Sequence, residues 1–315
     1  MKSARSKWGI VLAQIVVLAV VLYFIGRMIA KLWPEMRELK WHFTPTTIAE
    51  IVALGVAYQA CLVVGWRLAL AATGAEISWI GAAQSQIIGA LARYVPGKVL
   101  TIVGKGYLAS RAGVPVSRAT LAMFIEAAAM TTTSLAVGSA YIVVVVPDQQ
   151  HLLPLAGIAI LGCLIVMHPR VLPWILNAIF VRIGREPVEL RYRLPAIAKL
   201  VGCYLVLWCV TGLALHVMGR GLGVSLSWVA LAAGFALSWA IAFLSFIFPA
   251  GIGLREVVLA KLLGPAADAG VAMGIALASR AWILAAELAC ALAVWIVGRW
   301  LRNRPEDIEA DIEED

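Results

Sequence analysis

Three ionisable side chains lie well inside apolar stretches of this 315-residue sequence. Glu126 falls within one stretch, and Arg280 and Glu287 fall within the last one, seven residues apart and so on about the same face of a helix. Charged groups at such depth usually face the protein interior, where they pair or mark a substrate path. We therefore expect Arg280 to pair with Glu126 or Glu287. The glutamates would serve in proton coupling, as counter-ions, or only in a neutralised buried network.

Two apolar segments, residues 77–113 and 226–264, are each interrupted by proline and glycine. The first break is Arg93-Tyr94-Val95-Pro96-Gly97-Lys98, and the second is Phe248-Pro249-Ala250-Gly251-Ile252-Gly253. Proline ends a helix, and glycine permits unusual dihedral angles and close approach. At membrane depth such breaks are tolerated where protein or a water-filled cavity covers the freed backbone groups. An ordinary proline kink explains one break alone, whereas two matching breaks favour a substrate site.

Basic residues follow each break in pairs six residues apart, Lys105 and Arg111 after the first and Arg255 and Lys261 after the second. Arginine can bind phosphate oxygens through two parallel hydrogen bonds, whereas lysine acts as a point charge. The candidate substrate-binding residues are the following: Arg93, Pro96, Gly97, Lys98, Lys105, Arg111, Pro249, Gly251, Gly253, Arg255, Glu256 and Arg280. No catalytic residue is assigned. Arg93, Lys98 and Arg118 equally fit side chains that reach from apolar surface to the membrane interface.

The composition indicates that membrane-spanning helices position these residues. Hydrophobic residues make up 62% of the chain and charged residues 14%, whereas soluble domains have roughly 45–50% and about 25%. A single soluble domain is therefore excluded. We expect an all-α integral membrane protein with about six full transmembrane helices and two broken or re-entrant hairpin segments, eight membrane segments in all. The full spans are expected near residues 8–32, 48–72, 119–146, 152–167, 196–218 and 271–297, with an interfacial helix at 171–183.

The two halves of the chain, about 46–146 and 196–299, share one order of elements. Each has a span, a turn ending in Ile77-Ser78-Trp79 or Leu226-Ser227-Trp228, an interrupted segment and another span. Counting spans makes the interrupted segments enter from opposite sides, which predicts an inverted repeat. Residues 1–304 are expected to form one transmembrane domain and 305–315 an acidic, disordered tail. Basic clusters place both termini in the cytoplasm, at the inner membrane.

Motifs for other chemistries are missing from the sequence. The five cysteines show no metal-ligand spacing and the four histidines are scattered, so no metal or other cofactor is expected. There is no phosphate-binding glycine loop or nucleophile motif, and a nucleic-acid partner is not expected. Trp8, Trp33, Trp174 and Trp300 lie near expected span ends and are interpreted as interfacial anchors.

The two breaks, together with the stretch from Lys105 to Gly113, Glu126, and Leu254-Arg255-Glu256, resemble the signature regions of the lysylphosphatidylglycerol synthase transmembrane-region (flippase-domain) family. The resemblance covers nearly the whole chain. It implies a multi-span inner-membrane protein; in bifunctional members the membrane region moves aminoacylated phosphatidylglycerol between leaflets and a separate soluble domain makes it. No synthase domain is seen in this sequence, so aminoacyl transfer is not expected. Pro-Ala-Gly stands where the family often has Pro-Gly-Gly, which affects the cavity shape and the lipid preference.

The leading hypothesis is a lipid flippase, not an enzyme, which moves an anionic or headgroup-modified lipid of the phospholipid or polyprenyl-phosphate type by alternating access. One alternative is a membrane-embedded enzyme acting on lipid-linked substrates, with Glu126, Glu256 or Glu287 as acid or base. Another is a non-transporting accessory subunit of a lipid-synthesis complex. Besides the lipid, the partners left open are a second copy of the chain and a lipid-synthesis enzyme.

Overall fold

The structure is a computed structural model that describes residues 41–92, 98–145, 147–166, 168, 170–182, 194–245, 254–265 and 267–302, with residues 23, 27 and 30. Throughout this part the regular elements are helices, and four of them are long and apolar enough to cross a membrane. They are α2 (Pro45–Ala72), α6 (Val116–Val144), α9 (Leu194–Gly221) and α12 (Ala269–Arg302). The all-α, multi-pass class is confirmed. The expected first span, residues 8–32, lies almost entirely outside the described residues.

Shorter helices fill the intervals between these four. The first interval holds α3 (Trp79–Ala83), the π-helical turn η1 (Gln84–Ile88), α4 (Gly89–Leu91) and α5 (Lys98–Arg111). The interval before α12 holds α10 (Trp228–Leu244) and α11 (Leu254–Leu263). The breaks themselves, residues 93–97 and 246–253, lie outside the described residues.

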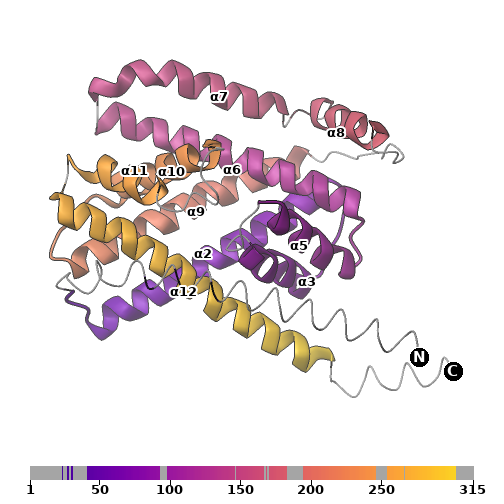
Figure 1. The fold of residues 1–315 in the computed structure, drawn as a ribbon, viewed down its shortest axis with the longest axis horizontal. Helices are drawn as coiled ribbons and strands as arrows, with labels where there is room; N and C mark the ends of the chain where they lie inside the picture. The colour runs from indigo at the N-terminus through magenta and orange to yellow at the C-terminus, as the bar shows by residue number, and fades with distance from the viewer. Residues whose placement is uncertain are drawn as a thin grey trace.

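The connection between the halves begins with η3 (Pro147–Leu152) and continues as α7 (Leu153–Val166) and α8 (Val171–Arg182). The helix α7 has 14 residues, roughly 21 Å at 1.5 Å per residue, which is shorter than a hydrocarbon core of about 30 Å. The expectation of six long spans is therefore met only in part. The helix α8 matches the expected helix at 171–183, and its place at the interface stays a prediction. In Figure 1 both helices lie along α6, at the edge of the molecule.

The turns that end α2 and α9 have the same backbone geometry. Gly74 has φ 74° and Gly223 has φ 77°, a region open to glycine because it has no Cβ atom. The N–H of Gly74 donates to the oxygen of Ala71, and the N–H of Gly223 donates to the oxygen of Arg220, each at 3.0 Å. The donors of the two hydrogen bonds are 149 residues apart, and so are the acceptors (223 − 74 and 220 − 71). One C-cap structure therefore occurs at corresponding positions of the two halves; it also ends α5, where Gly113 has φ 85° and its N–H donates to the oxygen of Ser110 at 3.1 Å.

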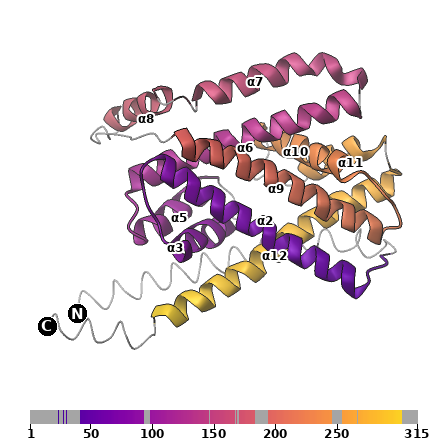
Figure 2. The ribbon, with the colours of Figure 1, turned by 180° about the vertical axis from the view of Figure 1, so that it is seen from behind.

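Corresponding long helices run in opposite directions. The helices α2 and α9 lie side by side, as both views show (Figure 1, Figure 2), and they are antiparallel. Glu50 near the start of α2 pairs with Arg220 near the end of α9 at 2.6 Å, while the Cys203 thiol donates to the oxygen of Cys61 at 3.3 Å. Helices α6 and α12 also run oppositely. An inverted repeat requires this geometry; the position of the membrane and the boundaries of the halves stay predictions.

Candidate functional site

A buried lysine forms the centre of the first charge cluster, which we define as Lys105, Glu126, Trp66 and Tyr204. Lys105 on α5 is 7% exposed, and its Nζ atom donates to Oε2 of Glu126 on α6. The same Nζ atom lies 3.8 Å from the ring centre of Trp66, which is fully buried on α2. Tyr204 on α9 is fully buried near Glu126, and its hydroxyl has no hydrogen-bond partner in the described structure. A carboxylate and an aromatic face together compensate the desolvation of the ammonium group.

The short helices of the first interrupted segment hold this cluster in place. Ser85 in η1 accepts a hydrogen bond from Nε1 of Trp66 at 2.9 Å and donates to the oxygen of Gly81 at 2.7 Å. Gly89 lets α4 approach α5, because a Cβ atom there would lie 2.9 Å from the Cα atom of Lys105. Single π turns inside helices are frequent at functional sites. Here the π turn supplies the residue that fixes the indole ring under the lysine.

The second charge cluster consists of Arg255, Glu256, Arg280 and Phe235. Nη2 of Arg255 lies 3.0 Å and Nη1 of Arg280 lies 3.6 Å from the same atom, Oε1 of Glu256. Arg255 and Glu256 are 8% and 5% exposed. The Arg255 guanidinium carbon lies 5.0 Å from the ring centre of Phe235 on α10. A buried arginine and a partly buried one therefore share one carboxylate, and Phe235 adds an aromatic face beside Arg255.

The two clusters differ in their charge balance. The first has one cation and one carboxylate, whereas the second has two cations on one carboxylate. Glu287 is 1% exposed and lies about two turns along α12 from Arg280. It adds a second buried carboxyl group to that side of the molecule. A pair of guanidinium groups suits a phosphate better than one ammonium group does, because each can present two parallel N–H donors.

The structure brings together five of the charged residues singled out from the sequence. Lys105 joins Glu126, and Arg255 and Arg280 join Glu256. Arg111 does not join either cluster: it is exposed at the end of α5, with Nη1 at 3.4 Å from the Tyr107 hydroxyl. The remaining candidates fall outside the described residues, except that the backbone of Lys98 begins α5: Arg93, Pro96, Gly97, Lys98, Pro249, Gly251 and Gly253.

Of the two expected partners of Arg280, Glu126 is wrong, and the pairing with Glu287 stays a prediction. Glu126 pairs with Lys105, and Arg280 pairs with Glu256. The reason lies in the packing, because α5 lies against α6 and α11 lies against α12. Glu126 and Arg280 on the long helices therefore each meet a charge on the short helix beside them.

Sequence reasoning missed the aromatic and polar members of the clusters. The sequence pattern does not single out Trp66, Ser85, Tyr204 or Phe235, because the tryptophans interpreted from it lie at span ends. A tryptophan six residues before the end of an apolar span, as Trp66 is in α2, was the available signal. Its N–H needs a hydrogen-bond partner when it is buried.

The fold and these clusters define a polytopic helical membrane protein with buried ion pairs on the helices that follow two interrupted segments. Residues 11–291 match the lysylphosphatidylglycerol synthase transmembrane region family, and the chain belongs to that family. A comparison with curated proteins found no match.

Proposed function

We propose that the protein is a lipid flippase of the inner membrane that moves an anionic or headgroup-modified lipid, of the phospholipid or polyprenyl-phosphate type, between leaflets. The observation that carries the proposal is the placement of buried cations on both helices that follow the breaks, Lys105 on α5 and Arg255 on α11. We take the protein to be a transporter and not an enzyme, with both termini in the cytoplasm. Its partner is the lipid; a second copy of the chain or a lipid-synthesis enzyme remains a further candidate.

Exchange of partners explains how buried cations can serve transport. A cation that is already desolvated and paired with a carboxylate loses little when a phosphate replaces that carboxylate. The Glu256 carboxylate, held by Arg255 and Arg280, occupies the place that a headgroup phosphate could take. Glu126 stands in the same relation to Lys105. Release of the phosphate restores the ion pair, which lets the headgroup leave.

The antiparallel halves support alternating access. In inverted repeats, one half rocks against the other around a fixed site, and the interrupted segments line that site. The helices α2 and α9, which pack against each other, provide an interface about which such rocking can occur. The acyl or prenyl chains would stay in the bilayer throughout.

The proposal is tested by lipid movement in vesicles that contain the purified protein. Fluorescent phosphatidylglycerol, lysylphosphatidylglycerol, a polyprenyl phosphate and phosphatidylcholine are compared by bleaching of the label in the outer leaflet. We expect faster movement of at least one of the first three lipids than of phosphatidylcholine. Each of the charge-removing variants Arg255→Gln and Arg280→Gln should slow this movement about tenfold or more. That is the effect of losing one charge-assisted hydrogen bond.

The matched control is Arg220→Gln, which removes a cation from an exposed ion pair on α9. It should leave the rate unchanged. Equal rates for all four lipids with and without protein would contradict transport, and unchanged rates in the charge-removing variants would contradict the role of the second charge cluster.

A further inference from the structure

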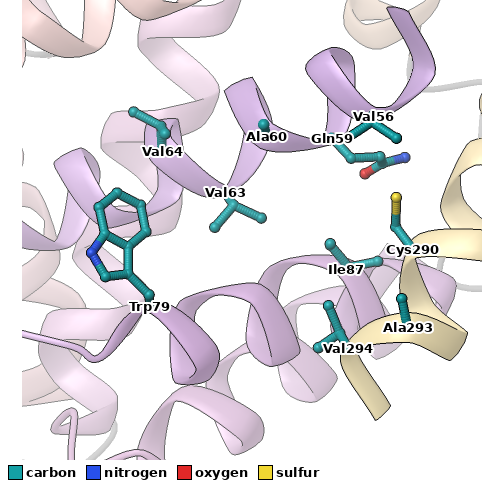
Figure 3. Close-up of a pocket in the computed structure, with 10 residues that line it drawn as sticks. All are labelled: Val56, Gln59, Ala60, Val63, Val64, Trp79, Ile87, Cys290, Ala293 and Val294. Carbon is teal, nitrogen blue, oxygen red and sulfur yellow. The ribbon is translucent and has the colours of Figure 1, made fainter. Parts of the chain in front are cut away.

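An apolar groove opens between α2, α12 and the short elements α3 and η1 (Figure 3). On α2 it is lined by Val56, Ala60, Val63 and Val64, and across from them lies Val294 of α12. Its volume is about 290 Å³, at the lower end of the roughly 300–1,000 Å³ of small-molecule pockets. The groove therefore has room for one hydrocarbon chain and not for a whole two-chain lipid.

The crossing of α2 and α12 creates the groove. The two helices touch at Gly55, where a Cβ atom would lie 3.1 Å from Cβ of Ala286, and Nε1 of Trp282 donates to the oxygen of Ile51 at 2.9 Å. Beyond this point the helices diverge, as Figure 1 shows. Ile87 of η1 lines the space between them. The groove is thus a consequence of the helix packing and not of a loop.

A fixed cation lies at one end of the groove. Arg67 follows Val63 by four residues and so continues the face of α2 that lines the groove. Its Nε atom donates to the oxygen of Ile77 at 3.1 Å, and its guanidinium carbon lies 4.0 Å from the ring centre of Trp79, which itself lines the groove. The ion pairs found among the described residues do not include Arg67. Its guanidinium is held by a carbonyl and a ring, and within the described part of the chain no carboxylate forms an ion pair with it.

We infer that this groove binds one acyl chain of a membrane phospholipid, whose phosphate is held by Arg67. The apolar walls match the hydrocarbon chain, and the guanidinium group matches the phosphate in charge and in its paired N–H donors. Arg67 and the lining residues lie one after another along α2. A lipid whose phosphate is at Arg67 can therefore extend its chain along the helix into the groove. The inference concerns binding only and does not rest on the proposed flippase activity.

Gln59 distinguishes an acyl chain from a polar occupant. It lines the groove, is 3% exposed, and its Nε2 atom has no hydrogen-bond partner in the described structure. It lies eight residues before Arg67, roughly 12 Å along the helix. At that distance from the phosphate it meets the chain and not the headgroup. Figure 3 shows it at the end of the groove away from Trp79. Gln59→Leu should therefore keep or strengthen binding of a chain and weaken binding of a polar molecule.

The test uses the full-length protein, purified in detergent and stripped of lipid, with a trace of phosphatidylglycerol that carries a photoreactive diazirine on one acyl chain. Peptide mapping should find the label on α2 between Val56 and Val64 and on the facing residues 290–294 of α12. Unlabelled phosphatidylglycerol should compete for the site. Diacylglycerol, which has the chains without the phosphate, should compete about tenfold less well, and inorganic phosphate alone should not compete.

Variants of the groove decide the outcome. Ala60→Trp should lower labelling about tenfold by displacing about two methylene groups of the chain. Its control is Cys209→Trp, because Cys209 is the exposed residue at the corresponding position of α9 (60 + 149). Arg67→Gln should also lower labelling about tenfold, while Arg220→Gln should not. If Ala60→Trp does not fold, Ala293→Trp fills the groove from α12.

Two results would overturn the inference. One is photolabelling that is spread over all apolar helix faces and is not reduced in the groove-filling variants. The other is loss of labelling in Gln59→Leu, which would show a polar occupant. Because the measurement is binding, failure of the vesicle transport experiment leaves it unaffected.

Discussion

The two halves of the molecule share their turns but not their buried charges. Arg67 donates to the oxygen of Ile77 at 3.1 Å, and Nδ1 of His216 lies 2.6 Å from the oxygen of Leu226. The second pair lies 149 residues after the first at both positions (216 − 67 and 226 − 77). A side chain one turn before the end of each helix thus ties it to the following turn. The geometry is the same although the side chain is arginine in one half and histidine in the other.

The interrupted segments differ more. In the first half, η1 supplies Ser85, which fixes Trp66 against Lys105. In the second half, α10 continues for 17 residues and supplies Phe235, which lies against Arg255. The two halves therefore share the turns that end α2 and α9, while the polar side chains of their interrupted segments differ. The difference suggests that the halves contact a substrate through different chemistry, a single ammonium group in one and paired guanidinium groups in the other.

The largest effects are expected from removing the carboxylate of each cluster. Glu256→Gln leaves two arginines without their shared carboxylate, and breaking a buried ion pair costs about 3–5 kcal/mol in the free energy of unfolding. Glu126→Gln should cost about 1–2 kcal/mol less, because it leaves one cation without its carboxylate instead of two. Equilibrium unfolding in mixed detergent micelles measures both values.

The double variant Lys105→Met with Glu126→Leu provides the control for this comparison. It removes both charges and should recover most of the stability that Glu126→Gln loses. A loss in Glu126→Gln equal to or larger than that in Glu256→Gln would contradict the importance of the carboxylate that two arginines share.

A second prediction concerns the contact between α4 and α5. Gly89→Ala would place a Cβ atom 2.9 Å from the Cα atom of Lys105. Because the neighbour is backbone, the cost should lie toward the upper end of the roughly 1–3 kcal/mol of overpacked positions. Gly202→Ala on α9 is the control, since nothing lies within 4 Å of its added Cβ atom, and it should be neutral or stabilising. Equal unfolding free energies for the two variants would show that this approach does not position the lysine.

Much of the fold could be predicted from the sequence, because membrane helices depend on long apolar runs and on local stop signals. The expected spans at 48–72 and 271–297 correspond to α2 and α12, and the short helix after each break is present as α5 and α11. The expected span at 152–167 corresponds to α7 within one residue at each end, but its 14 residues are fewer than a full crossing needs.

The site was predictable only in part, because pairing depends on which helices touch. The sequence singled out Lys105, Glu126 and Arg280, but their partners follow from the packing of α5 on α6 and of α11 on α12. Nor did it indicate the π turn that presents Ser85, since a single widened turn has no periodic signal. Arg67 was not singled out either, because its role depends on the turn that brings Trp79 over it.

The smallest effects are expected at the two repeated turns. Gly74→Ala and Gly223→Ala each place a Cβ atom in the left-handed region, with φ 74° and 77°, and each should cost about 1–2 kcal/mol in the free energy of unfolding. Equal losses in detergent unfolding would show that the turn acts locally and independently of the charge clusters. A larger loss of unfolding free energy in Gly74→Ala than in Gly223→Ala would come from the contact with Arg118 on α6. Its Nη1 atom donates to the oxygen of Gly74 at 2.9 Å. The double variant with Arg118→Gln would then lose less than the sum of the single changes, since residues that share a hydrogen bond are not additive.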